Sequence, residues 1–228
     1  VLGMETTVPV TMDEMLHHCK AVSRGAKNSF IIGDMPFMSY HVSVEDAIHN
    51  AGRFIKEAGC ESVKLEGGSE MAHVVKAIVD VGIPVCGHIG LTPQTATRLS
   101  GYTVQGKDAE GAKELLQSAK DLEEAGAFII VMECIPDILA SRITKELNIP
   151  TIGIGAGKDC DGQVLVLYDF LGLYNRIRPK FVRVYSDLSV QVKRAVGEFI
   201  KDINRGKFPS DKESYQMNLD ELVGLQNE

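Results

Sequence analysis

Short apolar runs alternate with amphipathic stretches along this chain, and that alternation limits the folds it can adopt. Each apolar run is bounded by glycine or polar residues. Aliphatic and β-branched runs of this length are typical of strands buried on both faces, as in a parallel sheet. The sequence therefore predicts six strands, at 30–34, 62–66, 84–88, 128–133, 151–154 and 164–168.

Helical patterns lie between these runs. From Val44 to the residue before Gly59, apolar positions recur every three or four residues, as in a helix that buries one face. Thr11 and Glu14 have the spacing of a capping box at the start of an earlier helix that stops at Gly25. Further helices are predicted near 70–81, 109–125, 137–147 and 187–204.

The alternation of strands and helices indicates βαβ units and a parallel sheet. A doubly wound open sheet accepts six strands, whereas a (β/α)8 barrel needs eight and usually about 250 residues. The first recognisable element here is a helix, and two strands ahead of Val1 would complete eight. We therefore expect an α/β fold of the (β/α)8 TIM-barrel type, with its first one or two strands missing from this chain. We expect a single, N-terminally incomplete barrel domain over 1–228, with an acidic C-terminal tail over 209–228.

Composition excludes several classes of protein. The chain has 228 residues, of which 44% are hydrophobic and 24% charged, as in ordinary soluble globular proteins. Its net charge of −7 lacks the basic surface that duplex nucleic acid requires. Nowhere do enough apolar residues run together to span a membrane. The five cysteines, an odd number without repeated spacing, indicate reduced thiols and a cytoplasmic location.

Polar side chains with catalytic potential stand at the ends of four predicted strands. They are Asp34, Glu66, His88 and Glu133, and Lys64 stands two residues before Glu66. Because side chains alternate along a strand, Lys64 and Glu66 lie on the same face. In a parallel barrel the carboxyl ends of the strands meet at one mouth, where active sites of this fold lie. The sequence therefore predicts a polar site at that mouth.

Each of these residues also has a purely structural interpretation. Asp34 is placed to cap the turn before Pro36, and Lys64 with Glu66 to form an ion pair inside the barrel. A lone histidine such as His88 is more often a core imidazole bonded to a backbone carbonyl. The glutamate that ends the fourth strand is placed to act as an acid near a helix N-terminus. Four independent coincidences at one rim are improbable, which favours a functional site.

The two carboxylates Asp34 and Glu66, without a Cys or His ligand cluster, favour a hard cation that prefers oxygen, such as Mg²⁺. Mg²⁺ retains some of its waters, so its remaining positions suit a small 2-oxo acid that chelates through carboxylate and ketone oxygens. A metal in that position acts as a Lewis acid toward an enolate.

Several segments of the chain match one protein family in that family's order, from residue 1 to about 182. The longest matches are Gly-Asp-Met-Pro-Phe-Met-Ser-Tyr at 33–40 and Pro-Val-Cys-Gly-His-Ile-Gly-Leu-Thr-Pro-Gln at 84–94. Others lie at 6–11, 63–68, 101–106, 133–136, 153–157 and 161–166. In these segments the chain resembles the ketopantoate hydroxymethyltransferases (3-methyl-2-oxobutanoate hydroxymethyltransferases).

The resemblance implies a (β/α)8 barrel that transfers a one-carbon unit from 5,10-methylenetetrahydrofolate, its co-substrate, to 3-methyl-2-oxobutanoate. The product is 2-dehydropantoate, an intermediate toward pantothenate and coenzyme A. The resemblance further implies that Mg²⁺ stabilises an enolate, which a glutamate base forms. Prokaryotic members of the family form rings of ten subunits, so a homo-oligomer, by default a decamer, is expected.

The resemblance assigns roles to the residues at the strand ends. Asp34 and Glu66 match the acids of the family's Mg²⁺ site, and Asp34 is also expected to contact substrate. Lys64 matches the lysine that contacts the substrate carboxylate. Glu133 matches the general base that removes the C3 proton. His88 matches a histidine of the substrate pocket.

One departure from the family's pattern stands out. The family carries a Gly-Asp-Ser segment at the end of its second strand, whose Asp is a metal ligand, shortly before the position that begins here at Val1. Its absence implies either that the chain is part of a longer protein or that it binds Mg²⁺ abnormally, and the missing strands favour the first. The alternatives are a Mg²⁺-dependent 2-oxo-acid carbon–carbon lyase or mutase of related barrel type, and a non-catalytic barrel remnant.

Overall fold

The computed structural model describes residues 1–95, 103–174 and 178–223. Two residues of the 101–106 family segment, 101 and 102, lie outside the described residues. The chain forms two compact units, Val1–Val164 and Leu165–Glu228. The prediction of one barrel domain over 1–228 with an acidic tail over 209–228 stays a prediction.

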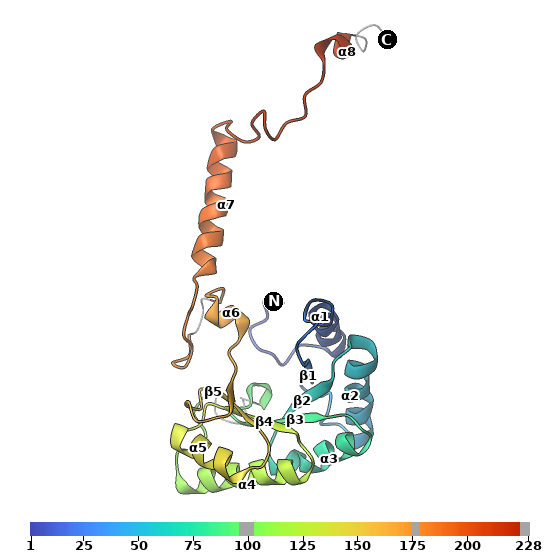
Figure 1. The fold of residues 1–228 in the computed structure, drawn as a ribbon, viewed down its shortest axis with the longest axis vertical. Coiled ribbons are helices and arrows are strands. Elements are labelled where there is room, and N and C mark those ends of the chain that lie inside the picture. The colour runs from blue at the N-terminus through green and yellow to red at the C-terminus, as the bar shows by residue number, and fades with distance from the viewer. Residues whose placement is uncertain (96–102, 175–177, 224–228) are drawn as a thin grey trace. The chain divides into compact units, whose positions relative to one another are not determined.

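The first unit alternates strands and helices (Figure 1). Its elements are α1 (Met12–Gly25), β1 (Ile32–Asp34), α2 (Val44–Ala58), β2 (Ser62–Glu66), η1 (Ser69–Met71), α3 (Ala72–Asp80), β3 (Val85–Gly90), η2 (Pro93–Thr95), α4 (Ala109–Glu124), β4 (Ile129–Glu133), α5 (Asp137–Glu146), β5 (Thr151–Ile154) and β6 (Gly162–Gln163). The second unit contains α6 (Leu167–Phe170), α7 (Leu188–Asn204) and α8 (Leu219–Val223).

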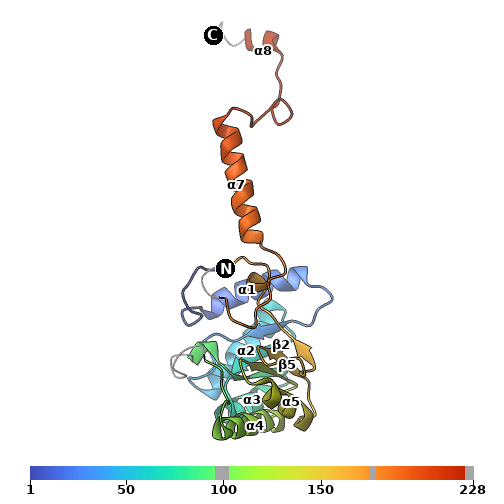
Figure 2. The same cartoon turned by 90° about the vertical axis from the view of Figure 1, so that its left-hand side faces the viewer.

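The strands form one sheet in the order β1-β2-β3-β4-β5-β6, and every neighbouring pair is parallel. A doubly wound sheet reverses its strand order at a switch point, and this sheet does not. The consecutive order is that of a barrel built from successive βα units. Figures 1 and 2 show helices α2 to α5 outside this curved sheet. The prediction of an α/β fold of the (β/α)8 TIM-barrel type is confirmed.

Register places the polar residues of the strand ends on one face of the sheet. Asp34 is paired with Lys64, and Glu66 with His88. Gly90, two residues beyond His88, is paired with Glu133. Paired residues of neighbouring strands point to the same side, as do residues two apart on one strand. The opposite face carries the buried side chains that pack on the helices, among them Val63, Leu65, Ile130 and Met132.

Local interactions explain why the helices begin and end where the sequence predicts. At α1, Glu14 N–H donates to Thr11 Oγ1 at 3.3 Å, and Thr11 N–H donates to Glu14 Oε2 at 2.8 Å, which completes the capping box. Helix α2 ends at Ala58, and the φ of 70° at its C-cap, Gly59, is left-handed. Phe54 of α2 lies against β1, where a Cβ at Gly33 would stand 2.4 Å from the ring. Glycine at that position therefore allows helix and strand to meet.

The predicted strand at 164–168 is wrong. The sixth strand is Gly162–Gln163, which pairs with Ile152 and Gly153, and a short helix begins at Leu167. Val164, Val166 and Leu167 are about half exposed, at 44%, 53% and 55%, whereas a central parallel strand is buried on both faces. A short apolar run has the same pattern in a strand and in a helix, so periodicity could not separate them.

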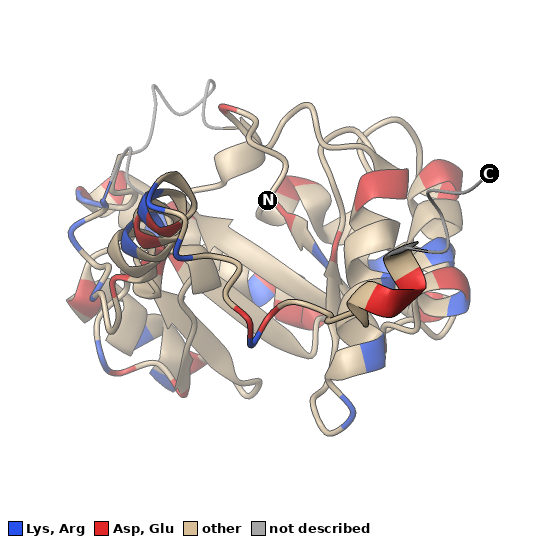
Figure 3. Ribbon diagram, turned by 90° about the horizontal axis from the view of Figure 1, so that it is seen from above, with Lys and Arg blue, Asp and Glu red and all other residues tan. Residues whose placement is uncertain are grey.

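The charges of the molecule are concentrated on its helices and loops. Figure 3 shows blue and red positions mainly there, and strands that are tan except at a few positions within the sheet. Asp34 ends β1, Lys64 and Glu66 lie in β2, and Glu133 ends β4. In the described part of the chain, no helix has the length and apolar character needed to cross a membrane.

Candidate active site

The five polar residues of the strand ends form one connected cluster. Lys64 Nζ lies 2.7 Å from Asp34 Oδ1 and 3.3 Å from His88 Nδ1. His88 Nδ1 lies 3.8 Å from Glu66 Oε1, and His88 Nε2 lies 3.3 Å from Glu133 Oε2. The structure therefore brings together every residue that the sequence assigns to the site, from four neighbouring strands.

Lys64 is the positive centre of the cluster. Burial lowers the pKa of its ammonium group, but the charges of Asp34 and Glu66 outweigh burial and raise that pKa above its ordinary value. The side chain is 16% exposed, so it is screened little by solvent. Lys64 is therefore charged at neutral pH and available to an anion.

His88 is neutral in this environment. Burial, and next the positive charge of Lys64, lower the pKa of its imidazole, although Glu133 opposes the shift. An ammonium group can only donate hydrogen bonds, so His88 Nδ1 accepts from Lys64 and the ring proton is on Nε2. Nε2 makes no aligned hydrogen bond to any described residue, and Glu133 Oε2 is the carboxylate oxygen it faces. His88 therefore presents an N–H toward Glu133.

Glu66 is a buried carboxyl group, 5% exposed. Burial raises its pKa to about 7; Lys64 and the Gln94 N–H oppose the shift, and the charges of Asp34 and Glu133 add to it. Its Oε2 accepts a hydrogen bond of 3.0 Å from the Gln94 N–H. The cluster thus contains three carboxyl groups and a single ammonium, an excess of acid that a bound cation would balance.

The donor set at Asp34 and Glu66 fits Mg²⁺ better than a softer metal. Among the described residues, no three His, Cys, Asp or Glu side chains are arranged to hold a metal ion by themselves. Mg²⁺ is commonly bound through one or two carboxylates, with water and substrate oxygens as its other ligands. The two acids and the negative charge of the cluster are therefore compatible with Mg²⁺.

A strained turn fixes the position of Glu133. The next residue, Cys134, has a φ of 49°, which is uncommon for a residue other than glycine. The carbonyl of Glu133 accepts a 2.8 Å hydrogen bond from Leu91 N–H, and Cys134 N–H donates to Ile154 O at 2.9 Å. A Cβ at Gly90 would stand 2.2 Å from that Glu133 carbonyl oxygen. The backbone that carries Glu133 is thus held from both neighbouring strands.

Two residues of the site were not among those predicted. Tyr40 lies in the loop after β1 and Gln94 in η2 after β3, and their exposed fractions are 1% and 6%. Both hydrogen-bond to Glu66. Tyr40 ends the family segment 33–40 and Gln94 ends the family segment 84–94. A polar residue inside such a segment was the signal that could have identified them.

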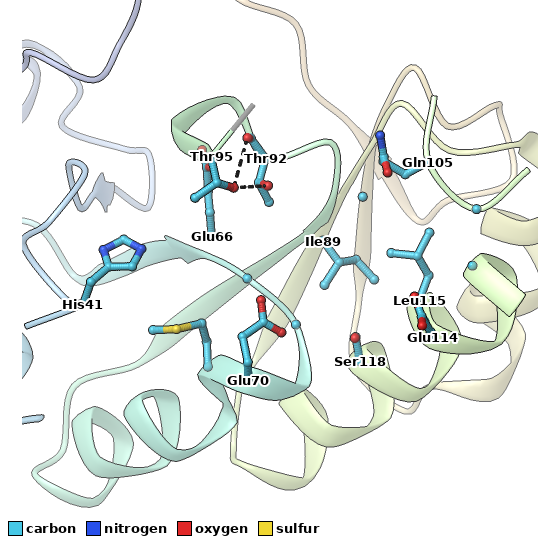
Figure 4. Close-up of a pocket in the computed structure, with 16 residues that line it drawn as sticks. His41, Glu66, Glu70, Ile89, Thr92, Thr95, Gln105, Glu114, Leu115 and Ser118 are labelled. Carbon is cyan, nitrogen blue, oxygen red and sulfur yellow. Dashed lines mark hydrogen bonds between the residues drawn. The ribbon is translucent and has the colours of Figure 1, made fainter. Parts of the chain in front are cut away.

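A cavity of 340 Å³ adjoins Glu66 (Figure 4). Ile89, Leu115 and Met71 provide apolar walls, and Gln105, Ser118 and the acids Glu70 and Glu114 provide polar ones. Thr92 and Thr95, whose hydroxyl oxygens are 2.6 Å apart, line it beside Glu66. The cluster is therefore next to a space large enough for part of a second molecule.

Comparison with known proteins gives the family. The family model described as ketopantoate hydroxymethyltransferase matches residues 1–211. The chain belongs to the ketopantoate hydroxymethyltransferase family. It is 57% identical over 217 residues to the 3-methyl-2-oxobutanoate hydroxymethyltransferase of Carboxydothermus hydrogenoformans, covering 95% of this chain and 79% of the relative. To the protein of that name from Heliobacterium modesticaldum it is 56% identical, covering 99% of this chain and 81% of the relative.

Membership of the ketopantoate hydroxymethyltransferase family makes the chain a transferase of hydroxymethyl groups, so the predicted family and enzyme class are confirmed. A solved structure of a putative phosphonomutase from Burkholderia cenocepacia has a TM-score of 0.51 and 13% identity, covering 85% of this chain and 79% of that one. At that identity the likeness concerns the fold alone.

Proposed function

We propose that this ketopantoate hydroxymethyltransferase transfers a hydroxymethyl group from 5,10-methylenetetrahydrofolate to 3-methyl-2-oxobutanoate. The product is 2-dehydropantoate, in the synthesis of pantothenate and coenzyme A. One observation carries the proposal. A carboxylate, Glu133, and a charged ammonium, Lys64, contact opposite nitrogens of the buried His88 ring. A small 2-oxo acid offers a carboxylate to the ammonium and a C3 proton to the carboxylate.

Lys64 binds the carboxylate of the oxo acid in this proposal. An ammonium group has three N–H bonds, and contacts with Asp34 and His88 account for two of them. The third donates to the substrate carboxylate. Charge-assisted hydrogen bonds of this kind are short and directional, so Lys64 fixes the end of the substrate opposite C3.

Glu133 removes the C3 proton. The proton passes to a carboxylate oxygen of Glu133, and the carbon–hydrogen bonding pair becomes that of the enolate. C3 of the enolate then forms a bond to the methylene carbon of the donor, and water supplies the hydroxyl group. Both carbon–nitrogen bonds of that methylene group break, and the two nitrogens take up the C3 proton and a water proton, which releases tetrahydrofolate. His88 Nε2 lies 3.3 Å from Glu133 Oε2 and presents its N–H to that carboxylate. The hydrogen bonds from Leu91 N–H to Glu133 O and from Cys134 N–H to Ile154 O hold the backbone that carries this side chain.

Asp34 and Glu66 are the residues that would hold Mg²⁺, and Asp34 also faces substrate through its contact with Lys64. When bound, Mg²⁺ supplies positive charge at the ketone oxygen, where negative charge develops. The excess of carboxyl groups over ammonium groups and the raised pKa of Glu66 support this assignment.

The cavity beside Glu66 is our proposed position for the folate donor. It shares Glu66 with the cluster, so a molecule within it lies next to the bound oxo acid. Its mixed apolar and polar lining suits a flat heteroaromatic ring with hydrogen-bonding edges.

We also propose that the protein is a homo-oligomer, by default a decamer, in the cytoplasm, without nucleic-acid or membrane partners. Helix α7 supports the assembly. Apolar side chains recur on one side of it at helical spacing and are about half exposed: Val192, Val196, Phe199, Ile200 and Ile203. An exposed stripe of that kind is typical of a helix that packs against another protein surface.

The reaction is tested by incubating the complete gene product with 3-methyl-2-oxobutanoate and following 2-dehydropantoate by liquid chromatography. We expect product only when both 5,10-methylenetetrahydrofolate and Mg²⁺ are present. We expect D34N to need more Mg²⁺ for the same rate. Cleavage of the oxo acid without folate would contradict the proposal and support a carbon–carbon lyase. An unchanged Mg²⁺ titration in D34N would remove Asp34 from the metal site.

A further inference from the structure

Tyr40 and Gln94 surround Glu66 with hydrogen bonds. The Tyr40 hydroxyl donates to Gln94 Oε1 at 2.8 Å and accepts from Glu66 N–H at 3.2 Å. The Gln94 N–H donates to Glu66 Oε2 at 3.0 Å, and Gln94 Nε2 donates to Met35 O at 2.8 Å. Both the backbone and the carboxylate of Glu66 are therefore held by this pair, which we call the Tyr40–Gln94 clamp.

The clamp joins the ends of three strands. Met35 directly follows Asp34 at the end of β1, Glu66 ends β2, and Gln94 lies in η2 after β3. Through Met35 O the Gln94 amide reaches the backbone next to Asp34, and through its own N–H it reaches the carboxylate of Glu66. A single glutamine thus connects the two acids that the proposed function assigns to Mg²⁺.

The polar groups of Tyr40 and Gln94 are needed for their hydrogen bonds around Glu66 and not for filling space. Burying a hydroxyl or an amide is costly unless it is hydrogen-bonded, and Phe or Met would fill similar volumes at positions 40 and 94 without that cost. Burial raises the pKa of Tyr40, so its hydroxyl keeps the proton that it donates to Gln94. The hydroxyl contacts Glu66 directly through the Glu66 N–H, and it contacts Gln94, whose backbone N–H donates to the Glu66 carboxylate.

We propose that Tyr40 and Gln94 are positioning residues that fix Glu66, and with it Asp34, in the arrangement that binds a divalent cation. This inference rests on the proposed function for the role of the two acids. Residues that hold the ligands of a metal typically contribute about 10- to 100-fold to metal affinity or activity when they are replaced.

The test compares Y40F and Q94M with wild type. Y40F removes only the hydroxyl, and Q94M removes the side-chain hydrogen bonds while it keeps the backbone N–H that contacts Glu66. Matched controls are Y215F, at a fully exposed tyrosine, and Q117M, which removes an exposed hydrogen bond to Asp121 on α4. Mn²⁺, which prefers the same oxygen ligands as Mg²⁺, is titrated into each protein and followed by electron paramagnetic resonance, without oxo acid or folate.

We expect the Mn²⁺ dissociation constant to rise about 10- to 100-fold in Y40F and Q94M and to stay unchanged in both controls. In a second assay, exchange of the C3 hydrogen of 3-methyl-2-oxobutanoate into heavy water is measured against Mg²⁺ concentration. The Mg²⁺ concentration for half-maximal rate should rise in both clamp variants, and the rate at saturating Mg²⁺ should return toward wild type.

Wild-type Mn²⁺ affinity in folded Y40F would overturn the proposal, even if the variant were less stable, because a merely structural role changes stability alone. Circular dichroism and urea unfolding establish that each variant is folded; if Q94M is not, Y40F, which keeps the ring, decides. The Mn²⁺ titration needs no turnover. Wild-type protein that binds Mn²⁺ and exchanges no C3 hydrogen would therefore overturn the proposed function, while the Mn²⁺ affinities still test the clamp.

Discussion

Replacing Gly90 and Gly82 by alanine, one at a time, distinguishes the cost of a positive φ from the cost of a steric clash at the site. Both glycines have a positive φ, and only Gly90 has close neighbours. Gly90 ends β3 with a φ of +93°, and Gly82 precedes β3 with a φ of +89°. A Cβ at Gly90 would stand 2.2 Å from the Glu133 carbonyl oxygen and 2.8 Å from Ile135 Cγ2, whereas at Gly82 nothing lies within 4 Å. G82A therefore changes the backbone preference alone, and G90A adds a collision.

The magnitudes follow from that difference. A residue with a side chain at such a φ costs about 1–3 kcal/mol, and this cost applies to both variants. Overpacking a well-filled site costs about 1–3 kcal/mol more, and this cost applies to G90A alone. We expect the free energy of unfolding to fall by about 1–3 kcal/mol in G82A and by about 2–6 kcal/mol in G90A.

We expect G90A and G82A to differ more in catalytic activity than in free energy of unfolding. In G90A the Glu133 carbonyl must move, and with it the 2.8 Å hydrogen bond from Leu91 N–H that holds the base. We expect C3 hydrogen exchange to be lost in folded G90A and retained in G82A. The assays are urea unfolding at one fixed protein concentration and proton NMR of 3-methyl-2-oxobutanoate in heavy water. Equal destabilisation and equal exchange in the two variants would refute the steric account of Gly90.

Three further predictions concern the cysteines, helix α7 and Lys64. Burial raises the pKa of Cys86 to about 12, so only about one thiol in 10⁴ is ionised at pH 8; Cys86 should react with a disulfide reagent only in denaturant, and rapid labelling of the native protein, located by peptide mapping, would argue against its burial. I200K on the apolar stripe of α7 should reduce the mass measured by light scattering, whereas E198Q on the opposite side should not; an unchanged mass in I200K would exclude the stripe from the subunit contact. K64M should raise the KM for the oxo acid by at least about tenfold, because it removes a charge-assisted contact; an unchanged KM would place the substrate carboxylate elsewhere.

Sequence patterns could predict the strands that carry the site because those strands are buried and bounded. The run Ser62–Glu66 ends where β2 ends, and the period of two along it places Lys64 and Glu66 on one face. That Asp34 and His88 lie near each other could be predicted only from the order of the strands in the sheet. The consecutive βα pattern predicted a barrel, in which strands that follow one another in the chain are neighbours, and the observed pairing agrees. The run at 164–168 failed because the exposure of its residues depends on tertiary structure.

Long-range polar contacts were beyond sequence patterns. Tyr40 and Gln94 are 54 positions apart, and no local periodicity relates them. The left-handed conformation of Cys134 was also hidden, since nothing in its residue type favours a positive φ. Both features depend on contacts between segments that are distant in the sequence. The contacts of Tyr40 and Gln94 hold Glu66, and the conformation of Cys134 affects the position of Glu133.

The central claim is that Glu133 removes a proton from a 2-oxo acid held by the cluster. The most direct measurement is C3 hydrogen exchange of 3-methyl-2-oxobutanoate into heavy water, with Mg²⁺ and without folate, in wild type and in E133Q. E124Q, at an exposed position that ends α4, makes the same chemical change away from the site. We predict wild-type exchange in E124Q and a loss of at least about 100-fold in E133Q. Exchange at the wild-type rate in folded E133Q would contradict the claim.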